Sequence, residues 1–112
     1  MKLDRWDIVF VPAHDKDATG HPAVVLSPPD ILDDPRQLRI NVLMGSKRVP
    51  SETGKPHQVI LNGADGLEFA TLLDCSLVYQ VRKASILRSA GRVAHARRSG
   101  IAARVRAALG VG

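Results

Sequence analysis

The stretch 20–28 (GHPAVVLSP) places a histidine between a glycine and a proline, directly before an apolar run with β-branched valines. Histidine has a reference pKa of about 6.5, so an imidazole can accept and donate protons at neutral pH. A histidine before a strand can also be an ordinary loop residue. The remaining motifs decide how strongly the chemical interpretation of His21 is favoured.

A hydroxyl and two cations follow another apolar segment. Ser46, Lys47 and Arg48 stand one residue, Gly45, beyond the segment 38–44, which alternates as a strand does. A phosphate held there could receive the Ser46 hydroxyl together with a cationic head group. The alternative is a solvated turn of sequence Gly-Ser-Lys-Arg.

Two further residues could assist proton transfer. Asp74 could orient His21 as carboxylates orient imidazoles, and His14, within the polar loop 12–20, could act as a second acid–base group. The alternatives are a local polar contact for Asp74 and a surface position for His14. Cys75, in an aliphatic segment, is expected to be a small buried residue and not a nucleophile.

The first two thirds of the chain have the rhythm of an all-β domain. Short apolar segments alternate with turn-forming clusters, and the segment 27–37 carries three prolines and three aspartates, which predicts a loop with at most one helical turn. Trp6 and Phe10 alternate as barrel-core residues do. The predicted strand segments are 6–11, 23–26, 38–44, 57–61, 69–73 and 77–82.

The period changes in the last part of the chain. Apolar residues there fall on one helical stripe, formed by Ile101, Val105, Ala108 and Leu109. Ser99 stands where it could cap the helix, and Gly110 stands where a helix stops. We therefore expect a single domain over residues 1–112, with a small β-barrel at about 6–87 and a basic helix at about 97–109.

Charge is divided unevenly along the chain. Residues 1–74 hold eight Lys/Arg and all eleven Asp/Glu, whereas residues 75–112 hold eight Lys/Arg and no acid. The last third therefore predicts a cationic surface for nucleic acid or an acidic protein segment. A solvated basic helix that only maintains solubility is the alternative.

Composition also limits the compartment and the cofactors. The single cysteine allows no intramolecular disulfide and no zinc site built from several cysteines of one chain, which suits a reducing cytoplasm. The N-terminal residues MKLDRWDIVF are too charged for a signal peptide, and no apolar run is long enough to span a membrane. We expect a cytoplasmic protein without a membrane segment, metal or cofactor.

The order of these motifs resembles the PemK/MazF family of toxins from toxin–antitoxin systems. The Trp-Asp-Ile-Val start, the PAVVLSP strand, the third strand ending near Ser46, the Gly66-Leu67 pair and the final helix carry the resemblance. It implies an SH3-like, partly open β-barrel with a C-terminal helix, and a homodimer. It also implies an endoribonuclease that cleaves single-stranded RNA without a metal, by attack of the 2′-hydroxyl, and an antitoxin with an acidic tail.

The chain departs from the family pattern at its catalytic positions. Family members usually carry an arginine before the Pro-Ala-Val-Val strand, where this chain has His21. A Thr-Thr or Thr-Ser pair usually ends the third strand, and here only Ser46 keeps a hydroxyl. An Arg-Cys-Asp triplet in some members corresponds to Asp74-Cys75-Ser76.

Taken together, the residues and the resemblance lead us to predict catalysis by His21, Ser46 and Asp74, and RNA contact by His14, Lys47, Arg48 and Ser76. One alternative is a barrel that binds RNA or an antitoxin-like partner without cleaving. A gyrase-poisoning toxin of the same fold is a third possibility, and no residue of the sequence argues for it.

Overall fold

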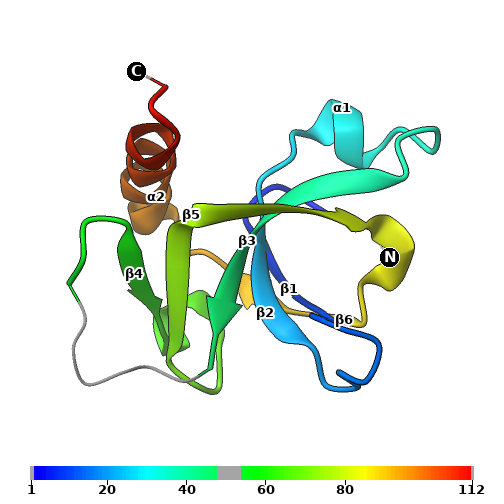
Figure 1. Ribbon diagram of the computed structural model, residues 1–112, viewed down its shortest axis with the longest axis horizontal. Helices are drawn as coiled ribbons and strands as arrows, with labels where there is room; N and C mark the ends of the chain where they lie inside the picture. The colour runs from blue at the N-terminus through cyan, green and yellow to red at the C-terminus, as the bar shows by residue number, and fades with distance from the viewer. Residues whose placement is uncertain (1, 48–53, 112) are drawn as a thin grey trace.

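The computed structural model describes residues 2–47 and 54–111, and these form one curled antiparallel sheet with a helix packed across it (Figure 1). The six strands follow the order β4-β5-β3-β2-β1-β6. Their bounds are β1 Asp7–Val11, β2 His21–Val25, β3 Arg39–Ser46, β4 Gln58–Leu61, β5 Thr71–Arg82 and β6 Arg88–Arg92. The helical elements are α1 Pro29–Leu32, the 3₁₀ turns η1 Gly63–Asp65 and η2 Lys83–Ser85, and α2 His95–Leu109. The predicted fold class, mainly β with a C-terminal helix, is confirmed.

The middle of the sheet is an antiparallel meander. β1 pairs with β2 through Ile8↔Val24 and Val11↔His21, and β2 pairs with β3 through Ala23↔Met44. The segment 27–37 between β2 and β3 contains only the single turn α1, as its prolines and aspartates predict. All five residues of β1 are buried, because both faces of this strand are covered.

β5 is one long strand where the sequence predicts two. Its first part pairs with β4 and with the end of β3 (Gly45↔Leu73), and its second part pairs with the rest of β3 (Leu43↔Val78). The register shifts between these two pairs, and the strand turns a corner in Figure 1. The interruption predicted between 73 and 77 is therefore a bulge that bends the sheet toward a barrel.

Two hydrophobic clusters lie on opposite faces of the central strands. Alternate residues of β1, such as Val9 and Val11, pack on one face against α1 and the second part of β5. Ile8 and Val24 pack on the other face with Leu73, Cys75 and Ile101. Cys75 is fully buried, as its aliphatic surroundings predict, and burial raises the pKa of its thiol to about 11.

The predicted barrel boundary near residue 87 is too early, because β6 adds an edge strand beside β1. The buried carboxylate of Asp65 links η1 to this edge by accepting the backbone N–H of Ala94 at 2.7 Å. It also accepts the N–H of Asn62 and pairs with Arg97 Nε at 3.3 Å. Gly91 lies so close that a Cβ there would stand 2.3 Å from the Asp65 carbonyl oxygen. These contacts hold the two ends of the curled sheet together.

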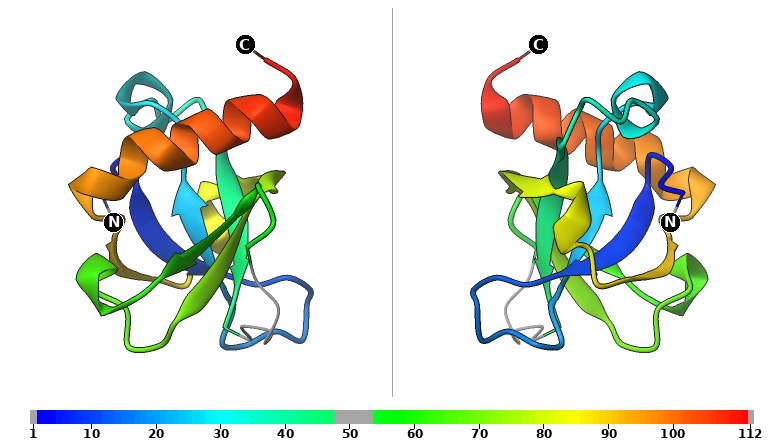
Figure 2. Two further views of the ribbon diagram at one scale, coloured as in Figure 1. Left: turned by 90° about the vertical axis from the view of Figure 1, so that its left-hand side faces the viewer. Right: turned by 90° about the vertical axis from the view of Figure 1, so that its right-hand side faces the viewer.

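α2 crosses the sheet and packs over β5 (Figure 2). It begins at His95, with Ala94 as the N-cap residue, so the expected cap at Ser99 is wrong and that residue lies inside the helix. The helix ends at Gly110, which takes a left-handed conformation with φ of 71°, as predicted. Ile101 is the one residue of α2 that is fully buried. Neither α2 nor any other helix in the described residues combines the length and the apolar character that crossing a membrane requires.

Candidate active site

The loop between β1 and β2 folds around the carboxylate of Asp17. This carboxylate accepts the backbone N–H of Ala13 at 2.9 Å and that of Gly20 at 3.0 Å. Gly20 has a φ of +77°, a conformation that glycine adopts without strain. The hydrogen bond from Ala13, followed by that from His21, lowers the pKa of Asp17 to about 2. The loop therefore presents an ionised carboxylate beside the first residue of β2.

His21 is that first residue, and its Nδ1 lies 2.7 Å from Oδ2 of Asp17. An ionised carboxylate can only accept, so Nδ1–H is the donor in this hydrogen bond. In the neutral imidazole, Nε2 is then the nitrogen with a free lone pair. The His21 side chain is 45% exposed, whereas that of Asp17 is 9% exposed. The pair is a largely covered carboxylate that orients an accessible imidazole, which is the arrangement of a general base.

Ser46 belongs to the same end of the sheet. The β2–β3 register is Ala23↔Met44, and continuing it by two residues brings His21 opposite Ser46. The close approach of Gly45 to the Pro22 carbonyl supports this, since a Cβ on Gly45 would lie 3.2 Å from that oxygen. Side chains of paired residues project to the same face of a sheet. The fold thus places the predicted residues His21 and Ser46 at the same end of two paired strands.

Asp74 does not orient His21, because Asp17 occupies that role. The carboxylate of Asp74 accepts the backbone N–H of Ser76 at 2.9 Å and the Ser76 hydroxyl, and it lies 3.9 Å from Nε2 of His57. Partial burial raises the pKa of Asp74, but the two hydrogen bonds from Ser76 outweigh burial and lower it overall. Asp74 and Ser76 form a local cluster on β5, and the expectation of a contact between Asp74 and His21 was wrong.

Positive charge reaches this end of the sheet from two strands. Lys47 Nζ lies 5.1 Å from the centre of the Phe10 ring, and the Arg88 guanidinium lies 4.0 Å from it. Arg88 also donates to the carbonyl of Thr19, in the loop that carries Asp17. Arg48 lies outside the described residues. The cationic partner of Lys47 in the structure is therefore Arg88, a residue that the sequence did not single out.

His14 lies in the same loop as Asp17 and is exposed. Its Nδ1 accepts the backbone N–H of Lys16 at 3.2 Å, and its carbonyl accepts the N–H of Asp17. Accepting at Nδ1 leaves the proton of the neutral ring on Nε2, the opposite tautomer to that of His21. Across the described ranges 2–47 and 54–111, no three His, Cys, Asp or Glu side chains converge as metal ligands.

Comparison with known proteins gives a fold and no sequence relative. No family model matches the sequence, and no curated protein matches it either. The fold matches toxin MazF-mt6 of Mycobacterium tuberculosis with a TM-score of 0.76 and 13% identity, over 95% of this chain and 98% of that chain. It matches an endoribonuclease in complex with its cognate antitoxin, from a mycobacterial species, with a TM-score of 0.75 and 14% identity, over 99% and 96% of the two chains. It matches a MazE–MazF structure from Deinococcus radiodurans with a TM-score of 0.77 and 15% identity, over 100% and 99%.

These neighbours show that the chain has the fold of MazF/PemK-type toxins, as the resemblance of the motifs implied. Two residues of the site escaped the sequence analysis. Asp17 stands four positions before His21, and this spacing becomes a contact only through the turn at Gly20. Arg88 lies in β6, a strand that its sequence did not reveal. The only sequence signal for either residue was its charge.

Proposed function

We propose that this protein is an endoribonuclease that cleaves single-stranded RNA without a metal ion, as the toxin of a toxin–antitoxin pair. The observation that carries the proposal is the Asp17–His21 pair. It places an oriented imidazole where the family resemblance implies a catalytic arginine. The fold it shares with an endoribonuclease and with MazF toxins supports the same activity.

In the proposed reaction, Nε2 of His21 takes the proton from the 2′-hydroxyl of the RNA. The 2′-oxygen forms a bond to phosphorus while the bond from phosphorus to the 5′-oxygen breaks. The products are a 2′,3′-cyclic phosphate and a 5′-hydroxyl end. The imidazolium that forms is stabilised by the Asp17 carboxylate, which stays ionised because its pKa is about 2.

The phosphate and the leaving oxygen need their own partners. We assign the phosphate oxygens to the Ser46 hydroxyl and to the cationic groups of Lys47 and Arg88. Arg48 is a further phosphate contact predicted by the sequence. The proton on the leaving 5′-oxygen is assigned to His14, since in its neutral tautomer Nε2 carries the proton. Ser76 keeps the role predicted for it as a contact to the RNA chain. Asp74, which was predicted to be catalytic, is assigned instead to holding Ser76, because its carboxylate accepts the Ser76 backbone N–H and hydroxyl.

The partners that we propose rest on the charge of the last third of the chain and on the family resemblance. We propose a homodimer in the cytoplasm, inhibited by an antitoxin whose acidic segment competes with RNA. Eight Lys/Arg and no Asp/Glu in residues 75–112 make this part of the surface attractive to both polyanions. Within it, Arg104 and Arg106 are exposed on α2.

The test is cleavage of a long single-stranded RNA by the purified protein in EDTA. His21→Ala is expected to lower the rate by about 10²- to 10⁴-fold, the usual contribution of a general base. Asp17→Asn is expected to lower it by at least about tenfold and by up to about 10⁴-fold, because the amide no longer fixes the tautomer of the imidazole. His95→Ala is the matched control, because His95 is exposed at the start of α2 and should leave the rate unchanged.

Cleavage that is unaffected by His21→Ala would refute the mechanism. Tight RNA binding without turnover between about pH 5 and pH 9 would instead favour the non-cleaving barrel. This second function has one observation in its support, the absence of the family arginine at position 21.

A further inference from the structure

Two arginines line a hollow at the end of the sheet remote from the candidate active site. The hollow has a volume of about 400 Å³ and lies between the segment that precedes β3 and the end of β5. Arg39 is the first residue of β3, and Arg82 is the last residue of β5. The eight residues of β3 span about 23 Å, and Ser46 stands at their other end.

The two arginines stand directly opposite each other. Arg39↔Arg82 is the outermost pair between β3 and β5, and the Lys83 N–H donates to the Leu38 carbonyl just beyond it. This bond makes Arg39↔Arg82 a pair without mutual hydrogen bonds, in which the Cα atoms lie about 4.5 Å apart. Paired side chains project to the same face. Ile40 packs into the cluster beside α1, so both arginines project to the opposite face of the sheet.

No acidic side chain balances this pair. Among residues 2–47 and 54–111, neither guanidinium has an acidic partner, and no described acid lines the hollow. Asp34, the acid nearest to Arg39 in the chain, pairs with Arg36 at 3.2 Å. Like charges directly opposite each other destabilise a strand pair. An anion between the two guanidinium groups would remove this repulsion and accept hydrogen bonds from both.

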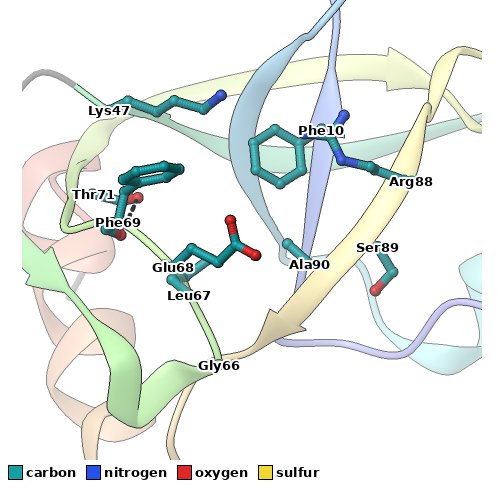
Figure 3. A pocket seen from close by; sticks show the side chains of 10 residues that line it. All are labelled: Phe10, Lys47, Gly66, Leu67, Glu68, Phe69, Thr71, Arg88, Ser89 and Ala90. Atoms are coloured by element: carbon teal, nitrogen blue, oxygen red, sulfur yellow. Dashed lines mark hydrogen bonds between the residues drawn. The ribbon is translucent and has the colours of Figure 1, made fainter.

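The cations at the other end of the sheet have different surroundings. Lys47 and Arg88 line a pocket of about 270 Å³ together with Glu68, whose carboxylate reaches into it in Figure 3. Both cations also lie over the Phe10 ring. The chain itself therefore supplies negative charge there, and it supplies none to Arg39 and Arg82.

The neighbouring strand pair indicates the kind of anion. Asn41↔Gln80 comes next on the same face, and both residues are exposed and uncharged. A nucleic-acid backbone is bound along a track of cations, whereas this surface offers two guanidinium groups followed by two amides. Guanidinium groups bind phosphate bidentately, and amides exchange hydrogen bonds with hydroxyl groups. The set fits a small phosphate ester that carries hydroxyls.

We propose that Arg39 and Arg82 bind the phosphate group of a small sugar phosphate, and that Asn41 and Gln80 contact its hydroxyls. The site lies away from His21 and does not depend on the proposed function. Free phosphate offers the same chemistry to the two arginines, so the test compares both ligands.

Thermal unfolding measures the binding, with sodium phosphate or ribose 5-phosphate added while sodium chloride keeps the ionic strength constant. At a concentration of about ten times Kd, the melting temperature should rise by about 6–11 °C, because the ligand binds only the folded chain. Arg39→Gln and Arg82→Gln should each weaken binding by about tenfold or more, as loss of a charged hydrogen-bond donor does. Without ligand, neither variant should melt below the unaltered protein, because each removes the repulsion.

Arg36→Gln is the matched control. It removes the same charge from an exposed arginine three positions before Arg39, but Arg36 is paired with Asp34 and does not line the hollow. Its response to both ligands should equal that of the unaltered protein. A melting temperature unmoved by either ligand, or a response equally strong in Arg39→Gln and in the control, would overturn the site.

Three further outcomes separate the sources of the phosphate. Tighter binding of ribose 5-phosphate than of phosphate, reduced by Gln80→Ala, would support the sugar phosphate, whereas equal affinities would overturn the contacts of the two amides. A response lost in Lys47→Gln and kept in Arg39→Gln would move the ligand to the candidate active site. Displacement of ribose 5-phosphate by a 2′-O-methyl RNA at lower concentration would replace the small ligand by RNA. Failure of RNA cleavage would change none of these results.

Discussion

Replacing Asp65 by asparagine should open the junction between η1 and β6. The Asp65 side chain is completely buried and lies where the two ends of the curled sheet meet. Asparagine has almost the same shape but carries no charge, and one of its two terminal groups is a donor. The substitution therefore tests the carboxylate while leaving the packing unchanged.

The contacts of Asp65 give the magnitude of the effect. Two backbone N–H groups, those of Asn62 at 3.0 Å and Ala94 at 2.7 Å, donate to the carboxylate. Hydrogen bonds to a charged group contribute about 1.5–3 kcal/mol each, and the asparagine NH₂ would face one of these donors. The partly exposed ion pair with Arg97 adds less than about 1 kcal/mol. We expect the free energy of unfolding to fall by about 3–4 kcal/mol.

Urea denaturation followed by circular dichroism measures this change, provided that the slope of the transition stays the same. Asp34→Asn is the matched control. The Asp34 carboxylate also has several polar contacts, all with Arg36, but they lie at the surface. Its urea midpoint should hardly move. A loss below about 1 kcal/mol for Asp65→Asn, or a loss equal to that of the control, would refute the assigned role.

Three other predictions concern single positions. Gly91→Ala should lower the free energy of unfolding by about 1–3 kcal/mol, because the new Cβ would meet the Asp65 carbonyl oxygen. Gly100→Ala in α2, where a Cβ would have no neighbour closer than 3.5 Å, should raise it by about 0.5–1 kcal/mol. Equal urea midpoints for the two variants would contradict this. Cys75, with its thiol pKa raised to about 11, should resist iodoacetamide at pH 8 until urea is added, and rapid native labelling would contradict its burial. The pKa of Asp17 is lowered from 3.8 to about 2, so the stabilisation that its carboxylate gives to the folded state is present above about pH 4 and lost as the pH falls through 2. Asp17→Asn should remove this part of the acid dependence of the urea midpoint. An unchanged dependence would refute the contacts of the loop.

Short apolar runs were sufficient to predict β1 and β2, because these strands bury both faces and tolerate few polar residues. β6 has the sequence RSAGR, which contains no apolar alternation, and it exists because β1 offers it an edge to pair with. The early start of α2 has a similar origin. No side chain caps the helix, and the N–H of its N-cap residue Ala94 is bound by Asp65 instead. Contacts between segments distant in the sequence determine where β6 forms and where α2 begins. A local sequence pattern cannot predict such contacts.

In the candidate site, too, some residues could be predicted from local sequence and others depend on contacts between segments. The places of His21 and Ser46 at the ends of strands could be predicted, because each stands beside a recognisable apolar segment. The carboxylate beside His21 could not, because Asp17 and Asp74 are equally plausible partners until the loop conformation is known. The positive φ of Gly20 and the two backbone donors around Asp17 decide between them.

The chemical identity of the RNA ends tests the central claim most directly. A single-stranded RNA incubated with the protein in EDTA should yield fragments with a 2′,3′-cyclic phosphate and a 5′-hydroxyl, detected by mass spectrometry. His21→Ala should produce neither end at a comparable rate. Fragments with 5′-phosphate ends, or cyclic-phosphate ends formed equally well by His21→Ala, would contradict the assignment of His21 as the base that activates the 2′-hydroxyl.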